Sequence, residues 1–218
     1  MFLLVCKSVI AQEYYEPKSI NGKERNDGPY LIYNENKVKI ISVKYGGYGM
    51  KIKADSFDIQ ELTGMKIKVR PNADMPPFTF KIFKYEPEPA HFEKPEKLLV
   101  VSDVEGNFED LVNILKVSGV INKKYEWTYG KNHLLINGDL VDRGDDVMAL
   151  LWLCYKLDNE SMLSGGKVHI NLGNHDGMDM SGDTRYVDKK YLYLDSLLKI
   201  NHQDLFGTNT KIGRWRND

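Results

Sequence analysis

The chain has too few cysteines to rely on sulfur chemistry. Only Cys6 and Cys154 are cysteine among its 218 residues. A disulfide framework is therefore excluded, and so is a zinc site built from several thiolates. Cys154 lies within the apolar run 150–155, and this run predicts a buried helix face.

An excess of positive charge and a long apolar run are also lacking. The chain has 30 Lys+Arg against 31 Asp+Glu, a formal net charge of −1. Binding to a phosphate backbone depends on clustered positive charge, so we expect no nucleic-acid partner. No apolar run approaches the ~20 residues that a membrane-spanning helix needs. The 42% of hydrophobic residues is instead typical of a chain that buries a core, in one large domain or two small ones.

The first twelve residues allow two interpretations. Residues 1–11 resemble the end of a secretory signal, with Val9 and Ala11 at the −3 and −1 positions before Gln12. The segment is short and lacks a basic start, so a first strand is the other interpretation; Cys6 as a lipoprotein anchor is disfavoured. We expect a signal remnant, which implies a place in the periplasm or cell envelope. Without export the chain would be cytoplasmic.

The composition changes near residue 95. Before it, short β-type runs separated by turn-forming residues predict a small antiparallel β module over residues 12–86. These runs cover residues 30–33, 37–43, 65–69 and 78–83. Prolines 87, 89 and 95 lie in a charged stretch, which predicts a linker at residues 87–96.

From residue 97 the pattern becomes strand, loop, helix. Three apolar runs, at 97–102, 133–137 and 167–172, each end at polar residues. Helical spacing follows the first run and again the second, from about 145 to 157. Parallel strands joined by crossovers place their carboxyl ends at one edge of a sheet, where open α/β folds build their sites.

The polar blocks at that edge are rich in oxygen ligands. They read Asp-Val-Glu-Gly-Asn at 103–107, Gly-Asp-Leu-Val-Asp-Arg-Gly at 138–144 and Gly-Asn-His-Asp at 173–176. Several carboxylates brought close together repel one another, and a divalent cation relieves that repulsion. The sequence therefore predicts a cation site.

These blocks resemble the signatures of the calcineurin-like metallophosphoesterase family, D-x-H-G-N, G-D-x-x-D-R-G and G-N-H-[DE]. The second and third blocks match at every defined position, whereas Glu105 stands where the family has histidine. Residues 182–187 and 207–215 are similar to the bacterial Shewanella-like protein phosphatases. The resemblance covers about residues 97–215. It implies an α/β fold in which 97–218 form the N-terminal half of an α-β-β-α sandwich, truncated, after the β module.

The resemblance implies a centre of two divalent metal ions. Asp103 and Glu105 would bind the first ion, and Asn174 the second. Asp139 would bridge both. We expect Mn²⁺, because Glu105 in place of histidine favours it. Mg, Fe and Zn are the alternatives. For Glu105 a solvated loop position stays open as the alternative.

The resemblance also implies roles in hydrolysis of a phosphomonoester, in which a hydroxide activated by the metals attacks phosphorus. His175 would protonate the leaving group, with Asp142 holding its imidazolium form. Arg143 would bind the phosphate, and Arg185 and Arg214 are weaker candidates for that contact. The expected substrate is a phosphorylated protein or small molecule, most simply a phosphoprotein.

Two alternatives to an active enzyme remain at this stage. The family completes its second metal site with later histidines, and the setting of His202 does not match theirs. The chain is then either a non-catalytic module that binds a metal or a phospho-ligand, or an inactive fragment.

Overall fold

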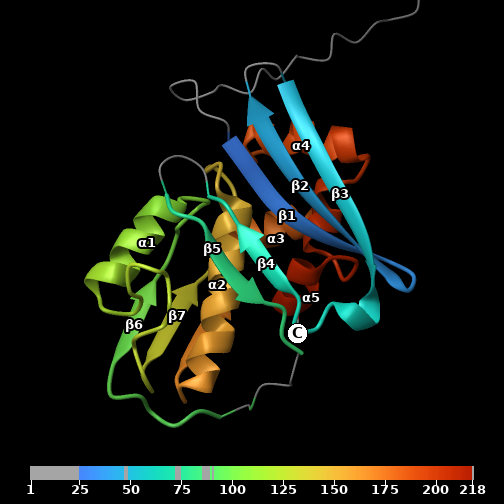
Figure 1. The fold of residues 1–218 in the computed structure, drawn as a ribbon. Helices are drawn as coiled ribbons and strands as arrows, with labels where there is room; N and C mark the ends of the chain where they lie inside the picture. The colour runs from blue at the N-terminus through green and yellow to red at the C-terminus, as the bar shows by residue number, and fades with distance from the viewer. Residues whose placement is uncertain (1–24, 47–48, 72–74, 85–88, 90, 218) are drawn as a thin grey trace, which may run out of the picture.

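The computed structural model describes residues 25–46, 49–71, 75–84, 89 and 91–217. The expected signal remnant at 1–11 lies outside these residues, and so does part of the expected linker at 87–96. The described chain is a mixed α/β fold with an antiparallel sheet near its N-terminus and a parallel sheet after it (Figure 1). No described helix is long and apolar enough to cross a membrane.

The N-terminal sheet has three strands in the order β1-β2-β3, namely β1 (Arg25–Asn34), β2 (Lys37–Gly46) and β3 (Gly49–Asp58). Neighbouring strands are antiparallel, and β2 buries Val38 and the alternating residues Ile41, Val43 and Tyr45. The strands expected at 30–33 and 37–43 are confirmed and are longer. Strand β3 was not predicted, although Met50, Ile52 and Ala54 alternate there with charged residues, and most of its side chains face solvent.

A second antiparallel pair follows the short 3-10 helix η2 (Ile59–Glu61). It consists of β4 (Lys66–Val69) and β5 (Phe78–Lys81), in which every second residue is buried. The ring of Phe80 stacks on Trp152 at 5.1 Å between centroids, and Phe78 stacks on Phe108 at 6.1 Å. This pair therefore packs on the part of the chain that follows residue 97.

The parallel sheet has the order β6-β7-β8, from β6 (Leu98–Val101), β7 (His133–Asn137) and β8 (Lys167–Asn171). Helix α1 (Phe108–Val117) connects the first two strands, and α2 (Val147–Leu163) connects the second two. The three expected parallel strands and both helices are confirmed. Leu98 and Val100 are 52% and 53% exposed, so the edge strand β6 presents two apolar side chains to solvent in the described chain.

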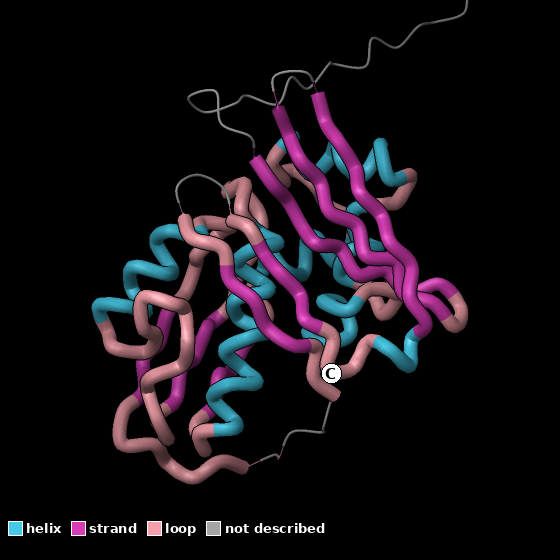
Figure 2. The backbone as a smooth tube through the Cα atoms, viewed as in Figure 1, coloured by secondary structure: helices cyan, strands magenta, loops and turns pink. Residues whose placement is uncertain are grey.

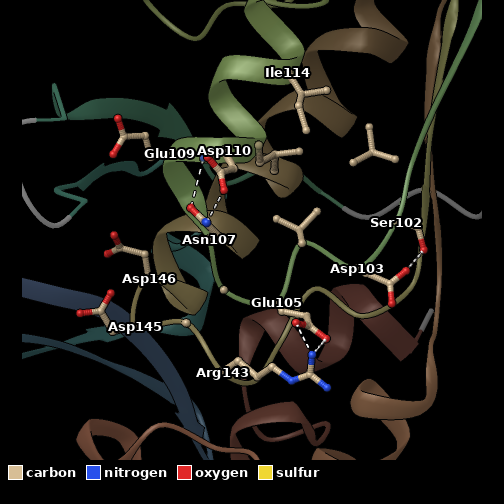
Figure 3. Close-up of a pocket in the computed structure, with 15 residues that line it drawn as sticks. Ser102, Asp103, Glu105, Asn107, Glu109, Asp110, Ile114, Arg143, Asp145 and Asp146 are labelled. Carbon is tan, nitrogen blue, oxygen red and sulfur yellow. Dashed lines mark hydrogen bonds and ion pairs between the residues drawn. The ribbon is translucent and has the colours of Figure 1, made fainter.

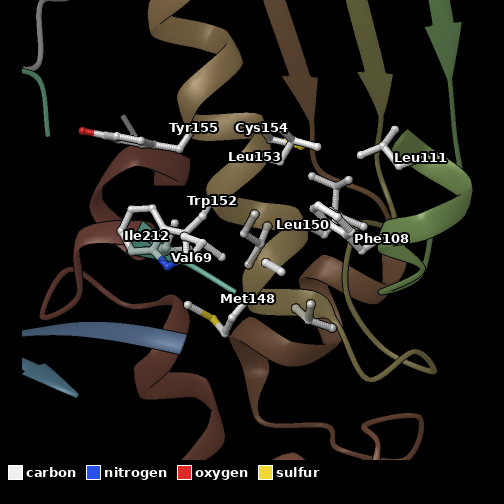
Figure 4. Close-up of a cluster of buried hydrophobic side chains, with 14 of the residues drawn as sticks. Val69, Phe108, Leu111, Met148, Leu150, Trp152, Leu153, Cys154, Tyr155 and Ile212 are labelled. Atoms are coloured by element: carbon white, nitrogen blue, oxygen red, sulfur yellow. The ribbon is translucent and has the colours of Figure 1, made fainter. Parts of the chain in front are cut away.

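Helix α2 is the centre of the hydrophobic core (Figure 4). Every residue from Val147 to Asp158 is buried, so the helix is covered on all sides rather than along one face as the run 150–155 suggested. Trp152 is fully buried and donates its indole N–H to the carbonyl of Pro29 at 2.8 Å. One cluster of buried apolar residues includes both β1–β5 and β6–β8. The tube in Figure 2 shows α2 between the β4–β5 pair and the parallel sheet.

Four short helical segments follow β8. They are α3 (Asn174–Ser181), α4 (Lys189–Leu198), η3 (His202–Phe206) and α5 (Lys211–Asn217). A buried ion pair ties α4 to the N-terminal sheet, because Lys190 Nζ lies 3.1 Å from Asp27 Oδ2. Lys190 also donates to the backbone carbonyl of Asp145, in the loop before α2. The N-terminal sheet is thus connected to a loop of the candidate site.

Candidate active site at the carboxyl edge of the parallel sheet

The loops that follow β6, β7 and β8 meet at one edge of the sheet, as the sequence predicted. The amide of Glu105 donates to the carbonyl of Asp139 at 2.9 Å, which joins the first loop to the second. A Cβ added to Gly138 would lie 2.6 Å from the backbone of Gly173, so the second and third loops touch because both positions lack a side chain. Several non-glycine residues here have positive φ, a strained conformation that concentrates at functional sites. They are Asp103, Glu105, Asp139, Asp142 and Arg143.

Asp139 is buried and held on both sides. Its Oδ1 accepts the backbone N–H of His175 at 2.8 Å, and its own N–H donates to Asp176 Oδ2 at 2.8 Å. The same oxygen of Asp176 accepts the N–H of Gly173 at 2.7 Å, while Arg216 forms an ion pair with the other oxygen. Asp176 therefore clamps the second loop to the third. We assigned it no role from the sequence, although it occupies the last position of the Gly-Asn-His-Asp block.

His175 and Asp142 form a buried pair. His175 Nδ1 lies 2.7 Å from Asp142 Oδ2, and since a carboxylate only accepts, Nδ1 carries the proton. The hydrogen bond to Asp142 raises the pKa of His175, against the effect of burial. Burial raises the pKa of Asp142 to about 6, although its bond to His175 opposes the rise. The structure thus brings together the two residues expected to act as acid and orienting carboxylate.

The other ring nitrogen of His175 faces a charged pair. His175 Nε2 lies 3.3 Å from Arg143 Nη2 and 3.8 Å from Glu105 Oε1. Arg143 and Glu105 are themselves joined at 2.7 Å (Figure 3). The ring of Tyr186 packs edge-on against His175 at 5.0 Å and lies below the guanidinium of Arg143 at 5.6 Å. The expected phosphate-binding arginine is therefore beside the expected acid, and it is neutralised by Glu105.

The oxygen donors at this edge fit a hard cation between Asp139 and Asn174, but not at Asp103 and Glu105. The side-chain amide of Asn174 lies 3.3 Å from Asp139 Oδ2. The structure places the amide oxygen of Asn174 there, which makes an oxygen pair suited to a divalent ion; with the amide turned over, its nitrogen would instead donate a hydrogen bond to Asp139. Glu105 is instead bound to Arg143, and Asp103 accepts from Ser102. Within the described ranges no group of three or more His, Cys, Asp and Glu is close enough to hold a metal.

A cavity of about 700 Å³ opens beside these loops. Its lining is strongly acidic, and Arg143 is the basic side chain in it (Figure 3). The acidic residues are Asp103, Glu105, Glu109, Asp110, Asp145 and Asp146. A phosphate dianion in this cavity would be repelled by the carboxylates unless cations neutralised them.

The two other arginines expected to bind substrate lie differently. Arg185 forms a forked ion pair with Asp183, at 2.7 Å from Nη2 to Oδ2, and its guanidinium lies 5.9 Å from the Tyr186 ring. Arg214 packs over the Tyr33 ring at 3.7 Å and donates to the carbonyl of Thr208. Arg185 is thus linked to the site through Tyr186, and Arg214 contacts the N-terminal sheet. Substrate contact by either remains a prediction.

Comparison with known proteins identifies the family. Residues 96–214 match the Calcineurin-like phosphoesterase family. The chain belongs to this family. The resemblance that the sequence blocks indicated is therefore confirmed, and in this calcineurin-like chain Glu105 stands where the signature has histidine.

The curated relatives of this calcineurin-like chain include named phosphatases. It is 39% identical over 101 residues to Shewanella-like protein phosphatase 2 of Arabidopsis thaliana, covering 46% of this chain and 26% of that protein. It is 31% identical over 124 residues to Shewanella-like protein phosphatase 1 of Plasmodium berghei, covering 52% and 34%. The chain thus spans about a quarter to a third of the length of these relatives.

A solved structure resembles the fold. It is the cold-active protein-tyrosine phosphatase of a psychrophilic Shewanella species, with a TM-score of 0.74 and 29% identity. The match covers 88% of this chain and 56% of that one. Because it reaches well beyond the 119 residues from 96 to 214, it includes elements of the N-terminal sheets as well as the parallel sheet.

Proposed function

We propose that this chain carries part of a metal-dependent phosphatase that hydrolyses phosphomonoesters, with phosphoproteins as substrates. The observation that carries the proposal is the 2.7 Å pair of His175 and Asp142, with Arg143 beside it and the Asp139 loop bonded to the His175 backbone. The names of the curated relatives, which are protein phosphatases, support the substrate class.

His175 supplies the proton in this mechanism. Water attacks phosphorus, the bond from phosphorus to the leaving oxygen breaks, and that oxygen takes the proton from His175 Nε2. Asp142 keeps the ring oriented and stabilises its cationic form, which agrees with the raised pKa of His175. Arg143, once released from Glu105, forks onto two phosphate oxygens. Arg185 is proposed as a further phosphate contact because it reaches the same Tyr186 ring; Arg214 is the weaker proposal.

Two divalent cations complete the proposed site. Asp139 and Asn174 would hold one, and Asp103, Asp139 and Glu105 the other, with Glu105 first leaving Arg143. Such ions supply charge neutralisation and activation of water in phosphate ester hydrolysis. The acidic cavity supports their involvement, because its carboxylates would otherwise repel the substrate. Oxygen donors favour Mn²⁺ or Mg²⁺ over softer ions.

The finer description of the architecture is also a proposal. We propose that residues 97–218 are the N-terminal half of an α-β-β-α sandwich, after a β module at 12–86 and a linker at 87–96. The exposed apolar side chains of Leu98 and Val100 on β6 support it, since a sandwich packs a second layer on such side chains. A place in the cell envelope rests on the signal-like residues 1–11 alone.

One observation favours a second function. The ion pair of Glu105 and Arg143 occupies both an expected metal ligand and the expected phosphate clamp. A chain locked in this state would be a non-catalytic module that binds a single divalent ion at Asp139 and Asn174. Titration calorimetry separates the two functions, because the module predicts one Mn²⁺ binding event without turnover.

Turnover of p-nitrophenyl phosphate by the full chain tests the proposed function. We expect Mn²⁺-dependent hydrolysis that falls at least about 100-fold in His175→Gln, the scale of general acid catalysis, and to background in Asp139→Asn. His91→Gln is the matched control, because His91 is exposed and lies outside the site. Hydrolysis that is equal in His175→Gln and the unaltered chain would contradict the assignment.

A further inference from the structure

A second buried histidine lies close to the His175–Asp142 pair. His202, at the start of η3, is 8% exposed. Its Nδ1 lies 2.8 Å from Asp195 Oδ2 on α4, and its Nε2 lies 3.5 Å from Asp179 Oδ2 on α3. Burial lowers the pKa of His202, but the bonds to Asp179 and Asp195 outweigh it and raise the pKa to about 9. His202 is therefore a buried cation between two carboxylates.

Asp179 connects this cation to the candidate acid. Asp142 and Asp179 line the same small cavity of about 10 Å³, together with His202. Asp142 uses Oδ2 for His175, whereas its Oδ1 and the Oδ1 of Asp179 are buried without a hydrogen-bond partner. The Asp179 carboxyl acts on Asp142 both as a like charge and as a hydrogen-bond partner, and both effects raise the pKa of Asp142.

Besides Asp142 and Asp179 themselves, the polar residues that line this cavity are Tyr191 and His202. The cavity is at the lower end of the volume that one water needs. Tyr191 also lines it, but its hydroxyl already donates to the carbonyl of Asp145 at 3.1 Å and accepts the N–H of Val147 at 2.9 Å. Two carboxyls in contact attract each other only when they share a proton.

The His202 cation offsets buried negative charge. Its two ring nitrogens face Asp195 and Asp179, and Asp142 lines the same small cavity as Asp179. Without this cation, neighbouring carboxyl groups would lie away from water with no positive charge between them, which is costly.

We propose that His202 and Asp179 are positioning residues for the His175–Asp142 pair. His202 Nε2 holds Asp179, Asp179 holds Asp142 Oδ1, and Asp142 Oδ2 is thereby kept on His175 Nδ1. This inference rests on the proposed function of His175 as the acid. It extends that function to a chain of residues running from the parallel sheet edge through α3 to η3 and α4.

The first test does not depend on turnover. In proton NMR of the full chain with a chelator, the ring Nδ1–H of His175 gives a hydrogen-bonded resonance that disappears in His175→Gln. We expect its exchange with water to accelerate about tenfold in His202→Gln and in Asp179→Ala. Asp179→Asn should retain the resonance, because the amide of asparagine donates to Asp142 and its oxygen accepts from His202. His91→Gln is the control that leaves it unchanged.

The second test uses kinetics on p-nitrophenyl phosphate with Mn²⁺. We expect kcat to fall about tenfold in His202→Gln with KM within twofold, since Arg143 is untouched and only proton delivery is disturbed. A folded His202→Gln variant that keeps both the resonance and kcat within twofold would overturn the proposal. If His202→Gln does not fold, the Asp179 variants decide instead. The proposal is overturned when Asp179→Ala and Asp179→Asn show the same exchange rate of the resonance and the same kcat. If the unaltered chain does not hydrolyse p-nitrophenyl phosphate, only the proposed function is contradicted. The His175 resonance then still tests whether His202 and Asp179 position the pair.

Discussion

Glu105 and Arg143 form an ion pair of 2.7 Å at the carboxyl edge of the parallel sheet. The pair joins the loop after β6 to the loop after β7. Each residue was expected to bind something else, Glu105 a metal and Arg143 a phosphate. In this structure each neutralises the other, so the proposed binding of a metal by Glu105 or of a phosphate by Arg143 would have to displace a contact that the chain already makes.

Replacing Glu105 tests that competition. In Glu105→His the family signature is restored and Arg143 loses its carboxylate partner. We expect the preference for Mn²⁺ over Zn²⁺ to decrease, because imidazole is a softer ligand than a carboxylate, and KM for p-nitrophenyl phosphate to fall because Arg143 is free to bind phosphate. Calorimetry and steady-state kinetics measure the two effects. Glu109→Gln, which also lines the cavity, is the control for loss of negative charge; an equal fall of KM in both variants would contradict a specific role for the ion pair.

His202 should make stability depend on pH. Its pKa rises from 6.5 to about 9 on folding, mainly through Asp179 and Asp195 after burial is overcome. A raised histidine pKa stabilises the folded chain fully below pH 6.5, and this stabilisation disappears as the pH rises through 9. Its size is on the order of 3 kcal/mol.

Urea unfolding of His202→Gln measures this dependence. The variant should be less stable than the unaltered chain at pH 6 by most of that amount, and the difference should narrow towards pH 10. His91→Gln should show no such trend, because His91 is exposed. A constant difference across this pH range would mean that His202 contributes packing rather than charge.

The shared core predicts that both sheets unfold together. Phe80 on β5 stacks on Trp152 of α2, and Phe80 is only 7% exposed. Phe80→Ala should lower the free energy of unfolding by about 3–5 kcal/mol, as large cavities do, within one cooperative transition. Circular dichroism and tryptophan fluorescence should then give the same midpoint. Two separate transitions would instead show that the β module at 12–86 is an independent domain.

The sequence predicted the parallel sheet well because its signals are local. The apolar runs of β6, β7 and β8 each end at polar residues, and the spacing between them leaves room for one helix. The α2 helix was predicted from its apolar run, although its burial on every side depends on the N-terminal strands that cover it. Strand β3 carries only a short alternation at Met50, Ile52 and Ala54, and most of its side chains face solvent, so its place beside β2 is decided by the fold.

The sequence by itself determined the family and the edge of the sheet at which Asp139, Asn174 and His175 meet. The edge could be predicted because the signature residues directly follow three strands. The crossovers between these strands make them parallel, so their carboxyl ends lie at one edge. Only the tertiary structure decided that Glu105 binds Arg143 and that His202 lies between Asp179 and Asp195. These contacts join segments from different loops and helices, and their geometry depends on burial and side-chain direction, which no local sequence pattern encodes.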